Sequence, residues 1–129
     1  MKPPLWMDRA TTLAIHDMMM AEHGGLVGVR DEGMLESALG RPENLFHYGT
    51  PTLPEMAAAY AFGIVRNHPF NDGNKRTGFL LAATFLEVNG LNFFATEESV
   101  VVSTLALAAQ EWDEAAYARW LSENSAPLS

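Results

Sequence analysis

Apolar side chains recur every three or four residues along most of the chain, which is the spacing of amphipathic α-helices. Capping residues and glycine or proline stops divide this pattern into about six helical segments. The first begins after Asp8, runs to Glu22 and stops at the glycine pair 24–25. The others are expected at Arg30–Leu39, at 54–67, at 74–88, after Thr96, and at 114–124, where Asp113 is the cap.

The segment 74–88 differs from the other helices because no charged residue occurs between Thr77 and Leu86. A helix that is apolar all round belongs in the middle of a fold. The pattern therefore predicts an all-α fold: one domain over residues 1–129, a compact bundle of about six helices around one central apolar helix.

The C-terminal third is less regular. A short extended piece is expected at 91–95, and the valines at 100–102 favour a strand enough to leave the segment after Thr96 open between helix and strand. Asp113 caps the last helix, and the tail 125–129 is expected to fray.

The segment 41–54 holds three of the seven prolines and shows no clean period, so it is predicted to be a loop. It carries two aromatic residues, Phe46 and Tyr48. These either hold a long loop against the core or form a flap near the active site that receives the backbone of a target protein. The flap is the preferred interpretation.

The charge balance limits the function classes. Acidic side chains outnumber basic ones by 16 to 8, so most of the surface repels phosphate polymers and direct nucleic-acid binding is disfavoured. The lack of cysteine removes disulfides and thiolate chemistry and fits a reducing compartment. No apolar leader precedes Asp8, and the longest uncharged apolar stretch, 100–109, is about half a membrane span. We expect a cytoplasmic protein with no membrane contact.

Positive charge is concentrated in one window. Arg66, Lys75 and Arg76 fall within eleven positions, and Asp72 alone opposes them. The window ends where the helix 74–88 begins, so free amide groups of its first turn would point at whatever binds there. A helix N-terminus beside Lys and Arg is an anion site, and phosphate is the usual anion. Arg66 could instead complement the dipole of the preceding helix, and both interpretations stay open.

The same window carries further chemistry. Gly73 has no side chain to obstruct a phosphate, and Asp72 offers carboxylate oxygens of the kind that bind Mg²⁺ together with phosphate oxygens. The imidazole of His68 could accept a proton from an attacking hydroxyl near neutral pH. From the residues alone, this indicates Mg²⁺-dependent transfer of a phosphorus-containing group from a nucleotide to a hydroxyl.

Other polar residues receive structural interpretations. His16 lies in line with apolar residues of the first helix and is interpreted as a residue at the edge of the core. Arg30, Asp31 and Glu36 are interpreted as a local ion pair on a solvated helix face, worth under about 1 kcal/mol.

A known signature resembles the stretch 68–77, which reads HPFNDGNKRT. The signature is H-x-F-x-(D/E)-(A/G)-N-K-R, that of the Doc, or death-on-curing, branch of the Fic/Doc superfamily. The likeness continues upstream at the glycine pair 24–25, at 28–31 and at 35–39, so it covers most of the chain from His16 to Gly90. This match also leaves open a supporting role at the site for Arg30, Asp31 and Glu36.

The resemblance implies the Fic/Doc fold and a role for each matched residue. His68 would be the general base, Phe70 a buried anchor of the loop, and Asp72 the Mg²⁺ ligand. The residues that would cradle the phosphates of ATP are Gly73, Asn74, Lys75 and Arg76. The resemblance further implies a toxin of a type II toxin–antitoxin system, which transfers the γ-phosphoryl group of ATP to a threonine of elongation factor Tu and blocks translation.

Two departures bear on the alternatives. Fic adenylyltransferases read H-x-F-x-(D/E)-G-N-G-R-x-x-R, whereas Lys75 replaces the second glycine here and Phe79 stands in place of the second arginine. Both argue against AMP transfer, while Gly73 matches the Fic form. A Fic-like adenylyltransferase and a catalytically silent module that binds a nucleotide or an antitoxin remain the alternatives. The self-inhibitory pattern (S/T)-x-x-x-E-(G/N) does not occur, so the expected partner is an antitoxin in trans, whose disordered tail folds onto a groove near the active site.

Overall fold

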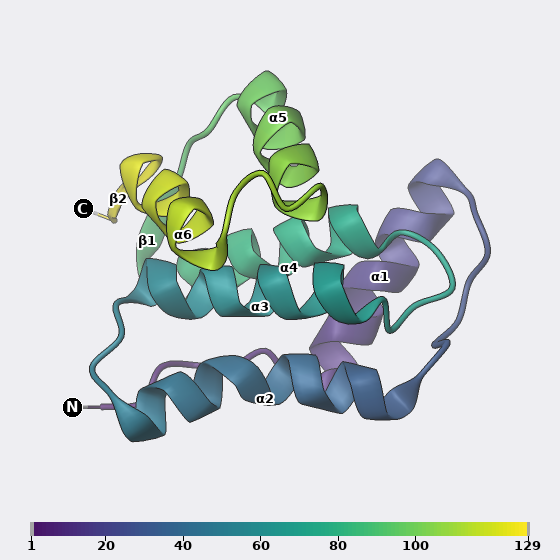
Figure 1. The fold of residues 1–129 in the computed structure, drawn as a ribbon, viewed down its shortest axis with the longest axis horizontal. Helices are drawn as coiled ribbons and strands as arrows, with labels where there is room; N and C mark the ends of the chain where they lie inside the picture. Colours follow the sequence, from purple (N-terminus) through teal and green to yellow (C-terminus); the bar gives the residue numbers. More distant parts are fainter. Residues whose placement is uncertain (1, 129) are drawn as a thin grey trace.

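The computed structural model describes residues 2–128 and places six helices and one small sheet in them (Figure 1). The helices are α1 (Arg9–His23), α2 (Glu32–Tyr48), α3 (Leu53–Asn67), α4 (Asn74–Val88), α5 (Glu97–Ala108) and α6 (Glu114–Glu123). The strands β1 (Leu91–Phe93) and β2 (Ser125–Pro127) pair antiparallel. The predicted all-α bundle of about six helices is confirmed, since each strand has only three residues.

Helices α3 and α4 lie side by side at the centre of the bundle (Figure 1). Helix α2 packs against α3 on one side, α5 and α6 cover the other, and α1 contacts α4. Helix α4 is buried along one face, as its uncharged sequence predicts, but α3 shares the central position because its residues 56–61 and 63–65 are all buried. No helix within residues 2–128 is long and apolar enough to cross a membrane.

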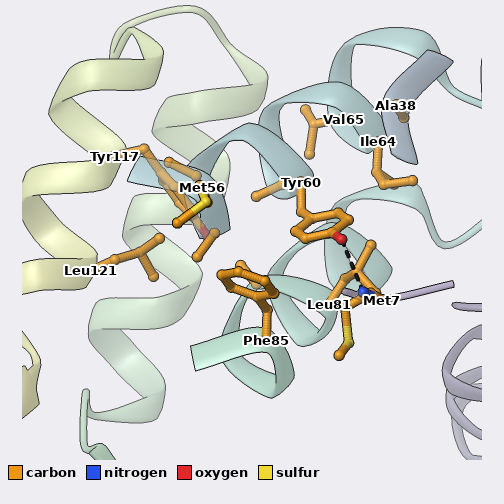
Figure 2. Close-up of a cluster of buried hydrophobic side chains, with 14 of the residues drawn as sticks. Met7, Ala38, Met56, Tyr60, Ile64, Val65, Leu81, Phe85, Tyr117 and Leu121 are labelled. Atoms are coloured by element: carbon orange, nitrogen blue, oxygen red, sulfur yellow. Dashed lines mark hydrogen bonds between the residues drawn. The ribbon is translucent and has the colours of Figure 1, made fainter. Parts of the chain in front are cut away.

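The core between these helices is formed largely by aromatic and aliphatic side chains (Figure 2). Tyr60 and Phe85 meet there with ring centroids 5.2 Å apart. The Tyr60 hydroxyl accepts a hydrogen bond of 2.9 Å from the Met7 backbone N–H, which ties the segment before α1 to the core. Burial raises the pKa of Tyr60 to about 12, so this hydroxyl stays neutral at physiological pH.

The second helix is longer than predicted, because α2 continues past Leu39 to Tyr48 with Pro42 inside it. Proline removes one backbone hydrogen bond from a helix. Leu35, Ala38 and Pro42 nevertheless form one buried face against α3, and this packing keeps the helix intact. The prediction of a loop over 41–54 is therefore wrong, and only residues 49–52 connect α2 to α3.

In the C-terminal part, the open choice after Thr96 is resolved and the prediction for the tail is wrong. The segment after Thr96 is helix α5, and the Thr96 side chain caps it by accepting from the Ser99 N–H. Residues 125–127 of the tail do not fray, because they pair with the extended piece at 91–93, while residue 129 lies outside the described residues. An unpaired strand edge offers free N–H and C=O groups to another segment. In this protein β2, from the chain's own tail, forms hydrogen bonds with β1.

The contact between α2 and α3 gives a first prediction. A Cβ at Gly63 would lie 3.0 Å from both Cα and Cβ of Ala38 on the facing helix. We expect Gly63→Ala to lower the free energy of unfolding by about 1–3 kcal/mol, because the two helices must move apart. Urea unfolding followed by circular dichroism measures this effect.

The matched control is Gly40→Ala in the same helix pair. A Cβ at Gly40 would meet no atom within 4 Å. This variant should raise the free energy of unfolding by about 0.5–1 kcal/mol, since alanine favours a helix over glycine. If both variants changed stability in the same direction and by the same amount, the close approach at Gly63 would not be limiting.

Candidate active site

A cavity of about 800 Å³ opens where the turn between α3 and α4 meets α1 and α5. The predicted site residues that line it are His68, Asp72, Gly73, Asn74, Lys75 and Arg76. Most of its apolar lining comes from α4, from β1 and the segment after it, and from α5, with Phe79, Leu80, Phe93, Ala95, Val100 and Leu105 among its residues. The fold thus gathers the predicted base, the predicted metal ligand and four of the predicted phosphate-binding residues in one largely apolar cavity.

His68 ends α3 in a left-handed backbone conformation, with φ 48°. In a residue other than glycine this conformation costs about 1–3 kcal/mol, and it persists only where surrounding contacts stabilise it. Arg30 does so from the connection between α1 and α2. Its guanidinium donates to the carbonyl of His68 at 2.7 Å and to that of Asn67 at 3.0 Å. Of the two interpretations of Arg30, the surface ion pair is therefore wrong and the supporting role at the site fits, because its charge stabilises the carbonyl end of α3 beside His68.

Asn74 ties the turn together from inside. Its side-chain Oδ1 accepts from the Phe70 N–H and its Nδ2 donates to the Phe70 carbonyl, each at 3.0 Å. The same Nδ2 lies 3.5 Å from Nδ1 of His68. Asn74 is only 6% exposed. Its side chain thus serves the turn, so a contribution of Asn74 to phosphate binding falls to its backbone N–H.

Phe70 is buried, as predicted, and its partner is a residue that sequence reasoning assigned to the edge of the core. The ring of His16 stacks on that of Phe70 with centroids 3.9 Å apart and planes 9° apart. Nε2 of His16 lies 2.9 Å from the carbonyl oxygen of Asp72, and since a carbonyl only accepts, this nitrogen carries the proton and donates. The available signal was a polar residue in line with apolar positions of the helix, because a buried polar group requires a partner.

Asp72 and Gly73 form the bend that leads into α4. The Gly73 N–H donates to Oδ1 of Asp72 at 2.8 Å, and the Asp72 side chain is exposed. Gly73 has φ 76°, and a Cβ there would overlap the side chains of Met19 and Met20 on α1. The positive φ favours glycine at this position, whereas the methionine contacts involve the ends of flexible side chains, which can move aside.

The N-terminus of α4 has no side-chain cap, and we call it open for that reason. In the part of the chain that the structure describes, every other helix begins with a side chain that accepts from an early amide, and these caps are Asp8, Asp31, Thr52, Thr96 and Asp113. The N-cap residue of α4 is Gly73, which has no side chain to accept from these amides. The first amides of α4 thus stand at the cavity wall beside the exposed Lys75 and Arg76, which makes this end of the cavity a site for an anion.

The segment that flanks the site is 24–31, between α1 and α2. Val29 forms a β-bridge with Phe70, and the Asn71 N–H donates to the Gly28 carbonyl at 3.1 Å. The backbone N–H of Arg30 donates to the Pro69 carbonyl at 2.6 Å. These backbone bonds join the turn to the segment 24–31.

Three residues that were predicted for the site lie outside it. Phe46 packs edge-on against Trp6, with ring centroids 5.8 Å apart, and Tyr48 is 90% exposed near the α2–α3 connection, at the end of α3 opposite the motif (Figure 1). The prediction of a flap is wrong because these residues belong to α2. The Arg66 guanidinium lies 5.3 Å from the centre of the Phe62 ring and does not line the cavity, so its predicted contact with phosphate is not supported.

The helical bundle and its motif turn define the class of protein. The chain belongs to the Fic/DOC family, which it matches over residues 6–86. It is similar to protein kinase doc of Escherichia phage P1, with 39% identity over 87 residues, covering 67% of this chain and 69% of the relative. It is also similar to toxin Doc of Mycolicibacterium smegmatis, with 43% identity over 75 residues, covering 56% of this chain and 57% of that relative. The resemblance inferred from 68–77 is confirmed.

The Arg30 clamp gives a second prediction. We expect Arg30→Ala to lower the free energy of unfolding by about 1–3 kcal/mol, because two charge-assisted hydrogen bonds to the end of α3 are lost. Chemical unfolding measures the difference. The control is Arg9→Ala, which removes a solvent-exposed ion pair with Glu32 and should cost less than about 1 kcal/mol. Equal effects of the two variants would mean that Arg30 is an ordinary surface residue.

Proposed function

We propose that the protein is a Doc-type protein kinase, which transfers the γ-phosphoryl group of ATP to a hydroxyl of another protein. The observation that carries the proposal is the open N-terminus of α4, which meets His68, Asp72 and Lys75 in one cavity. The name of the phage relative, protein kinase doc, supports an enzyme of the kinase type that uses ATP.

The phosphate groups of ATP bind at the N-terminus of α4. Its free amides and the side chains of Lys75 and Arg76 supply donors and positive charge in a chain whose net charge is −8. Bound there, the γ-phosphorus lies beside the side chain of His68. The fixed amides stabilise the negative charge on the phosphoryl oxygens without having to reorganise during the reaction.

His68 is the general base. Its side chain is exposed at the cavity, while Arg30 holds its backbone carbonyl and Nδ2 of Asn74 lies 3.5 Å from its ring nitrogen Nδ1. It accepts the proton of the acceptor hydroxyl as the oxygen forms a bond to the γ-phosphorus. The bond from that phosphorus to the bridging oxygen breaks, and ADP leaves.

Asp72 fits the role of a Mg²⁺ ligand. Its carboxylate is exposed at the cavity, and Oδ1 is oriented by the Gly73 N–H. Within residues 2–128 no group of three or more acidic, histidine or cysteine side chains could hold a metal by itself. This suits Mg²⁺, which binds through one or two carboxylates and completes its shell with phosphate oxygens and water. When bound, the ion neutralises charge on the phosphate oxygens.

The position of Phe79 favours phosphoryl over adenylyl transfer. The Fic pattern has an arginine at this position, which would hold a further phosphate. Here the Phe79 ring packs with those of Phe93 and Trp120, at centroid distances of 5.7 and 6.3 Å. An aromatic cluster thus stands where the second arginine of an adenylyltransferase would be required. The intact His68 and Asp72 in turn disfavour a catalytically silent module.

The finer parts of the proposal concern partners. The acceptor is a threonine of elongation factor Tu in the cytoplasm, and its phosphorylation stops translation. The similarity to toxin Doc supports a toxin that an antitoxin restrains in trans. The apolar wall of the cavity continues onto exposed side chains of α5, Val101 and Leu105, which suits an apolar antitoxin segment.

The reaction gives a third prediction. After incubation of elongation factor Tu with this protein, Mg²⁺ and ATP, intact-mass spectrometry should show a gain of about 80 Da, the mass of one phosphoryl group, whereas adenylyl transfer would add about 329 Da. The gain should vanish with His68→Ala. His47→Ala, which changes an exposed histidine on the far part of α2, is the matched control and should leave the gain intact. An adenylyl gain would establish the alternative reaction, and no gain would exclude this acceptor.

The metal site gives a fourth prediction. Asp72→Asn preserves size but removes the charge, so we expect kcat to fall by roughly 100-fold or more, and added Mg²⁺ should not restore it. Initial rates over a Mg²⁺ series measure this, with Glu111→Gln in the exposed connection between α5 and α6 as the control. Retention of the wild-type Mg²⁺ dependence by Asp72→Asn would place the metal elsewhere.

A further inference from the structure

We propose that His16 is a positioning residue of the phosphoryl-transfer site, which holds the peptide between Asp72 and Gly73 in the orientation that the site requires. The inference rests on the proposed function, because it gives His16 a role in binding Mg²⁺ and phosphate. His16 is not a catalytic residue, since it lies beneath the turn and acts through Asp72.

His16 is buried to an extent unusual for an imidazole. Only 1% of its surface is exposed, and one face of its ring is covered by Phe70. A buried polar group without a partner costs about 1–3 kcal/mol, so the position of its N–H group is strongly constrained. The partner is the carbonyl of Asp72, 2.9 Å away and 56 positions along the chain.

The hydrogen bond from His16 completes the restraint of one peptide unit. In the peptide that joins Asp72 to Gly73, the carbonyl accepts from His16 and the N–H donates to Oδ1 of Asp72 itself. Both polar groups of the unit are thus satisfied in a single orientation. The carboxylate that would hold Mg²⁺ is attached to this same unit, so its direction depends on the peptide plane.

Without the His16 donor, this peptide has freedom to rotate. Gly73 has φ 76°, and glycine adopts positive and negative φ at similar cost, so the bend itself does not prevent a flip. A flip would remove the N–H from Oδ1 of Asp72 and turn the carboxylate away from its present direction. It would also move the residue from which α4 begins, and with it the first free amides.

Two variants separate the hydrogen bond from the packing. His16→Phe keeps a flat ring to stack on Phe70 but has no donor. His16→Gln loses the ring but keeps an amide N–H at a similar distance along the side chain. The first readout is hydrogen exchange of the Gly73 amide in the nucleotide-free and metal-free protein, followed by NMR. The second is the steady-state rate over separate series of Mg²⁺ and ATP.

We expect His16→Phe to speed exchange of the Gly73 amide by about 10-fold or more, because the bond to Oδ1 of Asp72 opens more often. The half-saturating Mg²⁺ concentration should rise and kcat should fall. We expect the ratio of kcat to that concentration to drop by about 10–100-fold, as is typical for loss of a group that orients a metal ligand. The KM for ATP should also rise, because the flip moves the first free amides of α4 that bind the phosphate groups. His16→Gln should retain most of both properties.

Several results would overturn the proposal. Wild-type exchange at Gly73 together with a wild-type Mg²⁺ dependence in His16→Phe would show that the hydrogen bond does not matter. Equal losses in both variants would assign His16 to packing alone. If His16→Phe does not fold, His16→Leu provides a second variant without a donor and is compared with His16→Gln in the same way. If the wild-type protein phosphorylates no acceptor, the proposed function fails, while exchange at Gly73 still decides the role of His16.

Discussion

The side chain of Phe70 holds the turn between α3 and α4 against the core, and the site depends on that contact. Phe70 is 1% exposed, its ring stacks on His16, and both of its backbone polar groups bond to Asn74. A loop that was free to move could not place a base and a metal ligand at fixed positions. Because the anchor restrains the turn at its middle, His68 and Asp72 both face the same cavity.

The two helix ends that meet at this turn have opposite polarity, and only one of them is bonded to a side chain of opposite charge. The carbonyl end of α3 is neutralised by the Arg30 guanidinium. The amide end of α4 is left open by Gly73, although every other helix in residues 2–128 begins with a side-chain cap. The result is a local site for anions on an otherwise acidic protein, because only the positive end of a helix dipole remains unpaired.

Close packing of α3 against its neighbours sets the spacing within the site. A Cβ at Gly78 of α4 would lie 3.2 Å from the Ala61 carbonyl oxygen on α3, and one at Gly63 of α3 would press on Ala38 of α2. Small residues thus bring the backbones of three helices close together. Since His68 ends α3 and Lys75 lies in the first turn of α4, the distance between them follows from this packing.

Local signals in the sequence determined most of the helices, their caps and the motif at 68–77, because helical period, capping and turn chemistry act over a few residues. Only the tertiary structure decided the rest. Helix α2 runs through Pro42 because its buried face has α3 to pack on. His16 and Arg30 act on backbone groups 56 and 38 positions away in the chain. A sequence pattern shows that such a group needs a partner, but the fold determines which distant partner it meets.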